Sequence, residues 1–442
     1  MAESIQYTIT AAGASALVAQ LEADVASGRL APGQRLPSVR RLAAGAGLSP
    51  ATVAAGLAEL RRRGVVVSEP RRGTRVGEHP PLPAPLAIVL PDGVRDLSSG
   101  NPDPALLPDL AAALGRCPLP MRLYGEAPEL PELVDAACST LLADGVPAGE
   151  LGILGGALDG IERALAAWLR PGDRVAVESP GYAPLFDLLR AQGLGFEPVP
   201  VDERGMLPDP LQAALHRGAR AVVVTPRGQN PTGAALDEAR AGELRAILAS
   251  HPQALLLEDD HLGAVAGTAL HTLAGAGERW VSTRSVSKSL GPDLRLAVMA
   301  GDQATVARVR GRQACGTGWV SHVIQRLVAS LWADPEVTAL VRRAAGVYAG
   351  RREALLAALH ANGVQAQGAS GLNVWLPVRE EAATAAALLA RGWAVAPGSR
   401  YALSGREGAI RVTTAALDPG DAELLADDLA AVLAPATAIR SG

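Results

Sequence analysis

The eight residues Ser285-Val286-Ser287-Lys288-Ser289-Leu290-Gly291-Pro292 hold the only lysine of this 442-residue chain. Of its 41 lysines and arginines, the other forty are arginines. Arginine can replace lysine as a surface charge, but its guanidinium does not lose a proton and cannot attack a carbonyl. An amine that forms a Schiff base with an aldehyde therefore has no arginine substitute. Compositional drift explains the forty arginines, but it does not explain where the one lysine lies. Lys288 is predicted to be a reactive amine.

Three short strand-like runs come before this stretch, at 174–177, 221–224 and 254–257. Each run is followed by polar or glycine-rich residues, and helical stretches alternate with the runs from about Val94 onward. This alternation predicts an α/β domain with a mostly parallel sheet. Ligands of such domains bind beyond the carboxyl ends of the strands.

The residues that follow these runs carry the groups of one particular chemistry. Asp259 follows the third run, Asn230 follows the second, and Gly155-Gly156 leads into a helix that is predicted to start near Ala157. Pyridoxal 5'-phosphate (PLP) needs a lysine for its aldehyde, a carboxylate for its pyridine nitrogen and an anion cradle such as a glycine-rich helix N-terminus. Any one of these residues has a structural alternative, such as a helix cap or a turn. Their joint occurrence around the only lysine predicts a PLP site.

The first eighty residues indicate a separate small domain. Spacing and start signals predict helices over 15–27, 37–43 and 49–63, with strands over 65–67 and 74–76 that flank an arginine-bearing tip. Three helices and a hairpin make a winged helix-turn-helix. Its third helix enters the major groove of double-stranded DNA, and the wing follows the backbone. The alternative is a small helical domain whose arginines are merely solvated.

Specific residues of this segment match a known pattern. They are Gly28, Leu30, Pro32-Gly33, Leu36-Pro37-Ser38, Arg40, Leu42-Ala43, Leu48-Ser49, Thr52-Val53, Leu57, Leu60, Gly64 and Gly73-Thr74. On these residues the segment resembles the GntR family of bacterial regulators. The resemblance implies DNA contacts from Arg35, Ser38, Arg40, Arg41, Ser49, Ala51, Thr52, Arg71 and Arg72. Pro50 stands where the family usually has an arginine, so the other arginines are expected to carry more of the phosphate binding.

Residues from about 94 to 435 resemble the fold type I aminotransferases. The motifs that carry this resemblance are Glu178-Ser179-Pro180-Gly181-Tyr182, Asn230-Pro231-Thr232-Gly233, Ile410-Arg411-Val412 and the stretch around Lys288. The resemblance implies a large α/β domain with a mostly parallel sheet and a smaller C-terminal α+β part.

The same resemblance implies a role for each matching residue. Lys288 forms the Schiff base, and Asp259 pairs with the pyridinium nitrogen. Asn230 and His261 lie at the ring hydroxyl, and Tyr182 stacks on the ring. The phosphate is held by Ser285, Arg295 and the backbone at Gly156, Ala157 and Leu158, Tyr124 reaches the phosphate of a neighbouring subunit, and Arg411 binds an α-carboxylate. The role of Tyr124 implies a homodimer.

Two departures from the aminotransferase pattern bear on the chemistry. His261 stands where the family usually has a tyrosine, and Leu158 stands where it usually has a glutamine. PLP is still expected to bind, whereas efficient transamination is less well supported.

Composition places limits on other functions. Residues 1–78 carry ten arginines and six carboxylates, which gives this segment a net charge of +4. Because the whole chain has a net charge of −4, the remainder carries −8. A basic N-terminal segment points to nucleic acid. The three cysteines are odd in number and far apart, so neither a disulfide framework nor a metal site is expected. Neither a signal peptide nor a membrane span is indicated, and we expect a cytoplasmic protein.

The expected domains are a winged helix over 1–77, a proline-rich linker over 78–92 and an aminotransferase-like domain over 93–442. This architecture resembles the MocR regulators. It implies a PLP-dependent DNA-binding transcriptional regulator, with PLP as an aldimine on Lys288 and PLP itself, an amine or an amino acid as the effector. Two alternatives stay open: an active PLP-dependent aminotransferase, and a regulator that has lost PLP and keeps the fold as a scaffold.

Overall fold

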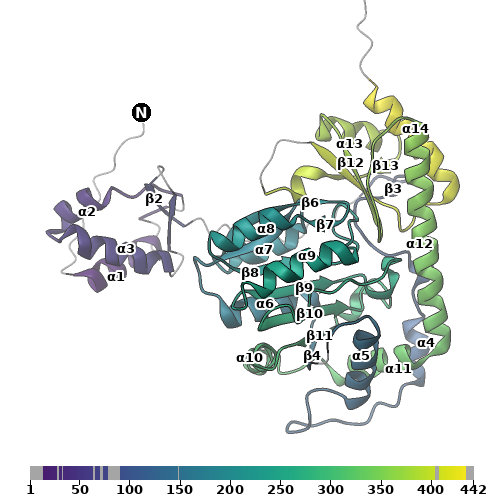
Figure 1. Cartoon of the computed structure of the whole chain (residues 1–442), viewed down its shortest axis with the longest axis horizontal. Coiled ribbons are helices and arrows are strands. Elements are labelled where there is room, and N and C mark those ends of the chain that lie inside the picture. Colours follow the sequence, from purple (N-terminus) through teal and green to yellow (C-terminus); the bar gives the residue numbers. More distant parts are fainter. Residues whose placement is uncertain are drawn as a thin grey trace, which may run out of the picture. The chain divides into compact units, whose positions relative to one another are not determined.

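The computed structural model describes residues 13–26, 29–31, 33–62, 65–69, 73–77, 90–147, 149–403 and 408–434. The chain divides into two compact units, of which the first contains the N-terminal residues and the second most of the rest of the chain. Figure 1 shows the elements of both.

The N-terminal residues form the predicted winged helix-turn-helix. Its elements are α1 (Ala14–Ala26), α2 (Val39–Ala46), α3 (Pro50–Arg62), β1 (Val66–Glu69) and β2 (Gly73–Val76). The two strands pair antiparallel, from Val66 opposite Val76 to Glu69 opposite Gly73. The side chain of Ser38 caps α2 by accepting from Arg41 N at 3.4 Å, and Ser49 Oγ accepts from Thr52 N at 3.1 Å at the start of α3. Arg71, Arg72 and residues 78–89 of the expected linker lie outside the described residues.

A compact apolar core holds these helices and the hairpin together. Leu17 on α1, Leu60 on α3 and Val66 on β1 are almost completely buried in it. Leu17 and Leu60 belong to the helical apolar spacing by which the two helices are predicted, and Arg35, Arg40 and Arg41 are left exposed.

The second unit is built on an eight-stranded sheet. Its strand order is β4-β11-β10-β9-β8-β5-β6-β7. The strands are β4 (Glu150–Leu154), β11 (Ala297–Gly301), β10 (Arg279–Ser285), β9 (Leu255–Asp260), β8 (Ala219–Val224), β5 (Arg174–Ser179), β6 (Gly195–Asp202) and β7 (Gly205–Met206). Strands β8, β9 and β10 run parallel, while β11 is antiparallel to both β10 and β4. The predicted α/β fold with a mostly parallel sheet is confirmed.

One predicted strand boundary was wrong in a way that matters for function. The run 254–257 was expected to end before the acidic residues, but β9 continues through Asp259 and Asp260. Backbone pairing of Asp259 with Thr283 and of Asp260 with Arg284 on β10 extends the strand. The two carboxylates are therefore held by a sheet and not by a loop.

Helices of this unit pack on the sheet and on one another. They are α4 (Leu110–Arg116), α5 (Pro131–Ala143), α6 (Ala157–Trp168), α7 (Ala183–Ala191), α8 (Pro208–His216), α9 (Glu238–Ala249), α10 (Gln303–Ala314) and α11 (His322–Ala333). Short 3-10 turns lie at Pro104–Leu106, Gly263–Ala266, Pro292–Leu294 and Gly398–Tyr401. In the described part of the chain, every helix is too short or too polar to cross a bilayer.

A smaller C-terminal part completes the second unit. It contains a three-stranded sheet of β12 (Asn373–Pro377), β15 (Ala409–Thr413) and β14 (Ala396–Pro397), the pair β13 (Trp393–Ala394) and β3 (Arg95–Asp96), and the helices α13 (Glu381–Leu389) and α14 (Pro419–Leu433). The long helix α12 (Pro335–Ala361) runs from α11 to α14 and joins this part to the large sheet (Figure 1). Because β3 pairs with β13, residues that begin the second unit are built into its C-terminal part.

Leu60→Ala should destabilise the winged helix by about 2–5 kcal/mol, because it removes a completely buried side chain from a small core. Hydrogen exchange of peptides from α1 and α3 in the full chain measures this local stability. Val67→Ala is the matched control, since Val67 is 51% exposed and its truncation should change stability by less than about 0.5 kcal/mol. Equal effects of the two substitutions would contradict the assigned core.

Candidate functional site

Lys288 lies just beyond the carboxyl end of β10. Its Nζ donates a hydrogen bond to the carbonyl of Gly100 at 2.8 Å. Burial and the charge of Arg411 lower the pKa of the Lys288 amine to about 8. About a tenth of the amine is then unprotonated at pH 7, whereas at its ordinary pKa less than about a thousandth would be. The surroundings make Lys288 a nucleophile at neutral pH.

Asp259 lies at the carboxyl end of β9 and is 7% exposed. Its Oδ1 is buried, and no group of the described residues donates a hydrogen bond to it. Burial and the neighbouring Asp260 carboxylate raise the pKa of Asp259 to about 7. A buried carboxylate without a donor is costly, and a bound cation or N–H group would relieve that cost.

These two groups test whether the residues fit PLP. The protonated pyridine nitrogen of PLP is a cationic N–H donor, which is what the Asp259 oxygen lacks. Its aldehyde is the electrophile that a partly unprotonated Lys288 attacks. The residues therefore fit this cofactor, which supplies an electron sink when bound.

His261 follows Asp259 at the end of β9. Burial and the charge of Lys288 lower the pKa of His261 to about 4, so its imidazole is neutral at physiological pH. A neutral imidazole has one N–H donor and one acceptor nitrogen. The imidazole also forms a hydrogen bond with the backbone of Asp259, which engages one of its two ring nitrogens.

Tyr182 and Asn230 each interact with charged residues of the predicted site. Burial and the Asp259 carboxylate raise the pKa of the Tyr182 phenol, and the charges of Arg295 and Arg411 act on it in the opposite direction. Asn230 Oδ1 accepts a hydrogen bond from Arg411 Nη1 at 3.0 Å. The structure therefore brings Tyr182 within electrostatic range of the Asp259 carboxylate and Asn230 into contact with Arg411.

A buried pair that the sequence reasoning missed holds these two loops together. The Gln229 side chain donates to Glu178 Oε2 at 3.2 Å and to the Pro180 carbonyl at 2.9 Å, and its oxygen accepts from Thr232 N at 3.0 Å. Burial raises the pKa of Glu178 to about 7, although hydrogen bonds from Thr225 and Gln229 oppose this. Glu178 and Gln229 both lie in or beside the motifs that contain Tyr182 and Asn230. Their contact could not be predicted from local sequence, because the two residues are about fifty positions apart.

The residues expected to hold a phosphate lie around the N-terminus of α6, which starts at Ala157. Gly156 has φ +116°, and a Cβ there would lie 2.6 Å from Arg295 Nη2, so glycine allows the arginine to approach. Arg295 Nη2 donates to the Gly155 carbonyl at 3.3 Å, and its side chain is otherwise exposed. Ser285 Oγ contacts Ser287 Oγ at 3.0 Å beside Lys288. Leu158 lies half-buried in the first turn of α6 and adds no polar group.

Arg411 on β15 is 4% exposed. Its Nη2 donates to the Ser98 carbonyl, its guanidinium lies 5.1 Å from the ring centre of Tyr401, and its Nε is buried without a hydrogen-bond partner in the described part of the chain. Burial lowers the pKa of Arg411 from its very high ordinary value, which still leaves it charged at neutral pH. A buried guanidinium with a spare donor suits a ligand carboxylate.

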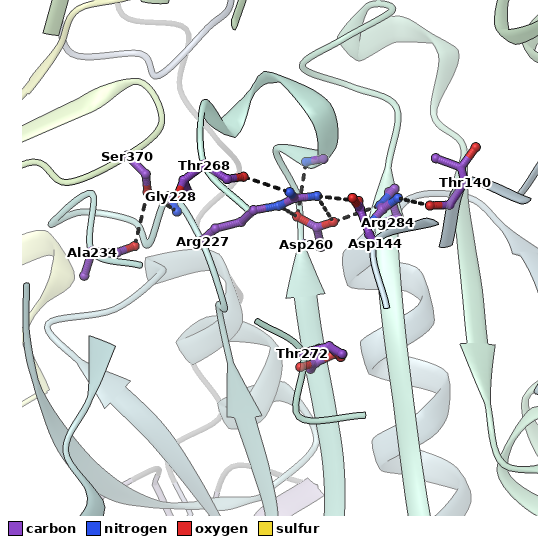
Figure 2. A network of polar contacts seen from close by, with 12 residues as sticks. Thr140, Asp144, Arg227, Gly228, Ala234, Asp260, Thr268, Thr272, Arg284 and Ser370 are labelled. Atoms are coloured by element: carbon purple, nitrogen blue, oxygen red, sulfur yellow. Dashed lines mark hydrogen bonds and ion pairs between the residues drawn. The ribbon is translucent and has the colours of Figure 1, made fainter. Parts of the chain in front are cut away.

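Figure 2 shows a buried ion network around Asp260, the residue that follows Asp259 on β9. Asp260 accepts from Arg227 Nε and Arg284 Nε, each at 2.8 Å, and both arginines also reach Asp144 at the end of α5, at 3.0 and 2.7 Å. Burial alone would raise the pKa of Asp260, but the hydrogen bond from Arg227 and the charge of Arg284 lower it below its ordinary value. The network connects β9, β10, the end of α5 and the loop after β8.

Tyr124 does not join the group around Lys288 within one chain. Its side chain is 92% exposed and packs edge-on against Trp319, with ring centres 5.6 Å apart. The sequence expectation placed it at the phosphate of a second subunit, so its exposure in a single chain is compatible with that expectation but does not test it.

The predicted DNA-contacting residues that the structure describes lie mostly at the surface of the winged helix. Arg35, Arg40, Arg41 and Ala51 are exposed, and Thr52 is half-buried. Ser38 and Ser49 are also exposed, but their hydroxyl groups cap α2 and α3. The two serines therefore have a structural role in addition to any contact with DNA.

Comparisons with known proteins agree with both units. A family model for aminotransferase class I and II matches residues 93–429, and one for bacterial regulatory proteins of the gntR family matches residues 14–76. The vitamin B6 salvage pathway transcriptional repressor PtsJ of Salmonella typhimurium is 40% identical over 92% of this chain and 95% of its own. The HTH-type transcriptional regulator TauR of Rhodobacter capsulatus is 32% identical over 78% of this chain and 79% of its own.

A solved structure shares the fold of the second unit. The α-aminoadipate aminotransferase LysN from Thermus thermophilus, complexed with N-(5'-phosphopyridoxyl)-L-leucine, superposes with a TM-score of 0.68 at 24% identity and covers 77% of this chain and 92% of its own. A DNA-binding winged helix joined to an aminotransferase fold defines a transcriptional regulator with a ligand-binding domain of enzyme type. The chain belongs to the aminotransferase class I and II family and, with its GntR-type domain, is a MocR-type regulator.

Asp260→Asn should lower the free energy of unfolding by about 3–5 kcal/mol, because it leaves two buried arginines with one carboxylate fewer. Urea unfolding followed by tryptophan fluorescence measures the change. Asp187→Asn is the matched control, since the ion pair of Asp187 with Arg190 is half-exposed and contributes about 1 kcal/mol or less. A loss for Asp260→Asn no larger than for the control would contradict the importance of the network.

The rate at which Lys288 captures PLP should rise about tenfold from pH 6 to pH 7 and level off above about pH 8, because the unprotonated fraction follows a pKa of about 8. Stopped-flow absorbance of the lysine-bound cofactor measures this rate. Arg411→Gln removes one of the two causes of the lowered pKa and should move the midpoint to higher pH. A rate that still climbs steeply above pH 9 would show an ordinary lysine.

Proposed function

We propose that this regulator binds PLP at Lys288 and changes its affinity for DNA in response. The observation that carries the proposal is the pairing of the only lysine, which has a pKa of about 8, with a buried Asp259 oxygen that lacks a donor in the described residues. The Lys288 amine needs an electrophile and the Asp259 oxygen needs a hydrogen-bond donor, and PLP would supply both. Capture of a ligand, rather than structural stability, accounts for this arrangement.

The remaining side chains have roles in the same proposal. Asn230 and His261 hold the ring hydroxyl, Tyr182 covers the ring, and Ser285, Arg295 and the backbone at Gly156, Ala157 and Leu158 hold the phosphate. Arg411 takes the carboxylate of an amino-acid effector where the effector has one. The charge and burial of Arg411 support this role, because a buried cation needs an anionic partner.

For the DNA side, we propose that Arg35, Ser38, Arg40, Arg41, Ser49, Ala51 and Thr52 contact an operator together with Arg71 and Arg72 of the wing. In this proposal the winged helix spans 1–77, the proline-rich linker 78–92 and the aminotransferase-like domain 93–442. The protein would act in the cytoplasm, where it meets both DNA and free PLP. Because PtsJ is named as a repressor of vitamin B6 salvage, vitamin B6 supply is the first condition to which we expect this regulator to respond.

We further propose a homodimer in which Tyr124 contacts the site of the partner subunit. Leu119, Met121, Leu123 and Tyr124 follow one another closely in the chain and are 48%, 86%, 70% and 92% exposed. Soluble proteins rarely leave such an apolar group uncovered. A second copy of the chain would cover it.

A second candidate function is aminotransferase activity. It is favoured by the presence of Lys288 together with the buried Arg411, which are the groups that a substrate amine and carboxylate require. Formation of a keto acid from an amino acid, with conversion of the PLP spectrum to its amine form, would establish this activity. Absence of turnover would leave the regulatory role alone.

PLP should change the affinity of the wild-type protein for the DNA upstream of its own gene by about fivefold or more, the usual size of coupling between two sites. Lys288→Ala should bind the same DNA but show no response to PLP. Fluorescence anisotropy with labelled DNA measures both affinities, and a scrambled duplex controls for nonspecific binding at the same salt concentration.

Lys288→Arg is the matched control variant, because it keeps the positive charge but cannot form the bond to an aldehyde. Equal PLP responses of Lys288→Arg and the wild type would contradict sensing through Lys288. If the wild type prefers no natural sequence, including divergent neighbouring promoters, the aminotransferase function becomes the better proposal.

A further inference from the structure

We propose that the short segment Asp96–Gly100 positions both Lys288 and Arg411 and conveys the state of these two side chains to the linker. The inference rests on the proposed function, because it explains how a ligand at Lys288 could act on DNA binding. The segment follows the expected linker by only a few residues, so it is where the chain entering the second unit first meets the site.

Two backbone carbonyls of the segment hold the two cations. Lys288 Nζ donates to Gly100 O at 2.8 Å, and Arg411 Nη2 donates to Ser98 O. Gly100 has φ +70°, and a Cβ there would lie 3.4 Å from Arg411 Nη2. The segment thus passes directly against Arg411, in a conformation that favours glycine.

One carboxylate sets the shape of this turn. Asp96 Oδ1 accepts from Ser98 N at 2.8 Å, from Ser98 Oγ at 2.7 Å and from Ser99 N at 3.2 Å. An aspartate that accepts from the amides two and three residues later fixes a local turn. Asp96 also lies within electrostatic range of Arg411. It therefore aims the Ser98 and Gly100 carbonyls without itself bonding to either cation.

The segment is anchored on both sides. Downstream, Asp103 is held by Arg351 Nη1 at 2.8 Å and by the hydroxyl of the buried Tyr348 at 3.1 Å, which fixes the chain to α12. Upstream, Leu97 is buried, its N–H donates to the Ala394 carbonyl at 2.9 Å, and its carbonyl accepts from Thr413 N at 2.8 Å. A change at the Ser98 and Gly100 carbonyls therefore acts next on these strand contacts of Leu97, which lie between the turn and the expected linker.

The chemistry at Lys288 and Arg411 acts on these same carbonyls. When the Lys288 amine condenses with an aldehyde, water leaves, and the nitrogen keeps at most one hydrogen in place of the three of the ammonium group. The hydrogen bond to Gly100 O is then weakened or lost. A carboxylate at Arg411 competes with Ser98 O for the same guanidinium. Each such hydrogen bond changes an equilibrium constant by about two- to tenfold, so loading the site loosens the turn.

The first test compares DNA affinity with and without PLP for the full-length wild type, Asp96→Ala and Asp96→Asn. Asp96→Ala removes the acceptor and should reduce the PLP response from about fivefold or more to less than about twofold, while PLP still binds to Lys288 with its affinity unchanged or raised by up to about tenfold, because the turn then competes less for the amine. Asp96→Asn keeps an acceptor oxygen and should retain the response. A full response in Asp96→Ala, or a large loss of PLP affinity, would overturn the proposal.

Asp109→Ala is the matched control. Asp109 Oδ1 caps α4 by accepting from Ala112 N at 3.0 Å, so the variant loses the same kind of contact without touching Lys288 or Arg411. It should respond to PLP as the wild type does. A response lost equally in Asp109→Ala and Asp96→Ala would reduce the effect of Asp96 to general destabilisation and overturn its special role.

Hydrogen exchange separates a failure of this inference from a failure of the proposed function. Adding PLP to the wild type should increase exchange in a peptide covering residues 95–101, whereas Lys288→Ala should show no change. If PLP alters the hydrogen exchange of that peptide but not the affinity for DNA, the segment responds to Lys288 and the regulatory proposal fails. If PLP alters DNA affinity but leaves the peptide unchanged, regulation stands and this inference is overturned.

Discussion

Two adjacent carboxylates at the end of β9 have opposite surroundings, and the predicted site depends on that difference. Side chains of neighbouring residues on a strand point to opposite faces. Asp260 on one face receives hydrogen bonds from Arg227 and Arg284, which lower its pKa, whereas Asp259 on the other receives none from the described residues, and its pKa is raised. The arginines satisfy Asp260 completely and leave Asp259 for a ligand.

The same separation explains why arginine cannot replace Lys288. A guanidinium group stays charged when it is buried, which suits ion pairs and carboxylate recognition. The pKa of an ammonium group falls on the same burial, and the nearby charge of Arg411 lowers it further, so that part of the Lys288 amine is unprotonated at neutral pH. A chain that uses arginine at every other basic position therefore still needs one lysine where an unprotonated amine is required.

Local signals in the sequence were sufficient for much of the fold. Helical spacing and start signals predicted α2 and α3, where Ser38 and Ser49 form the caps, and the glycines before Ala157 predicted the start of α6. The end of β9 could not be predicted, because pairing with β10 keeps two acidic residues in a strand that local propensity would end. The ion network and the Glu178–Gln229 pair were also missed, since their partners come from distant parts of the chain.

A sensor places different demands on such a site than an enzyme does. An enzyme must bind the transition state more tightly than the bound ground state, whereas a sensor needs only a ligand whose affinity differs between two conformations of the protein. Lys288 and Arg411 each bond to a carbonyl of one short segment, and that segment continues into the linker. Ligand binding and the segment therefore compete for the same donors. That competition is a difference in affinity between two arrangements of the chain, which is the physical requirement for coupling a small molecule to DNA binding.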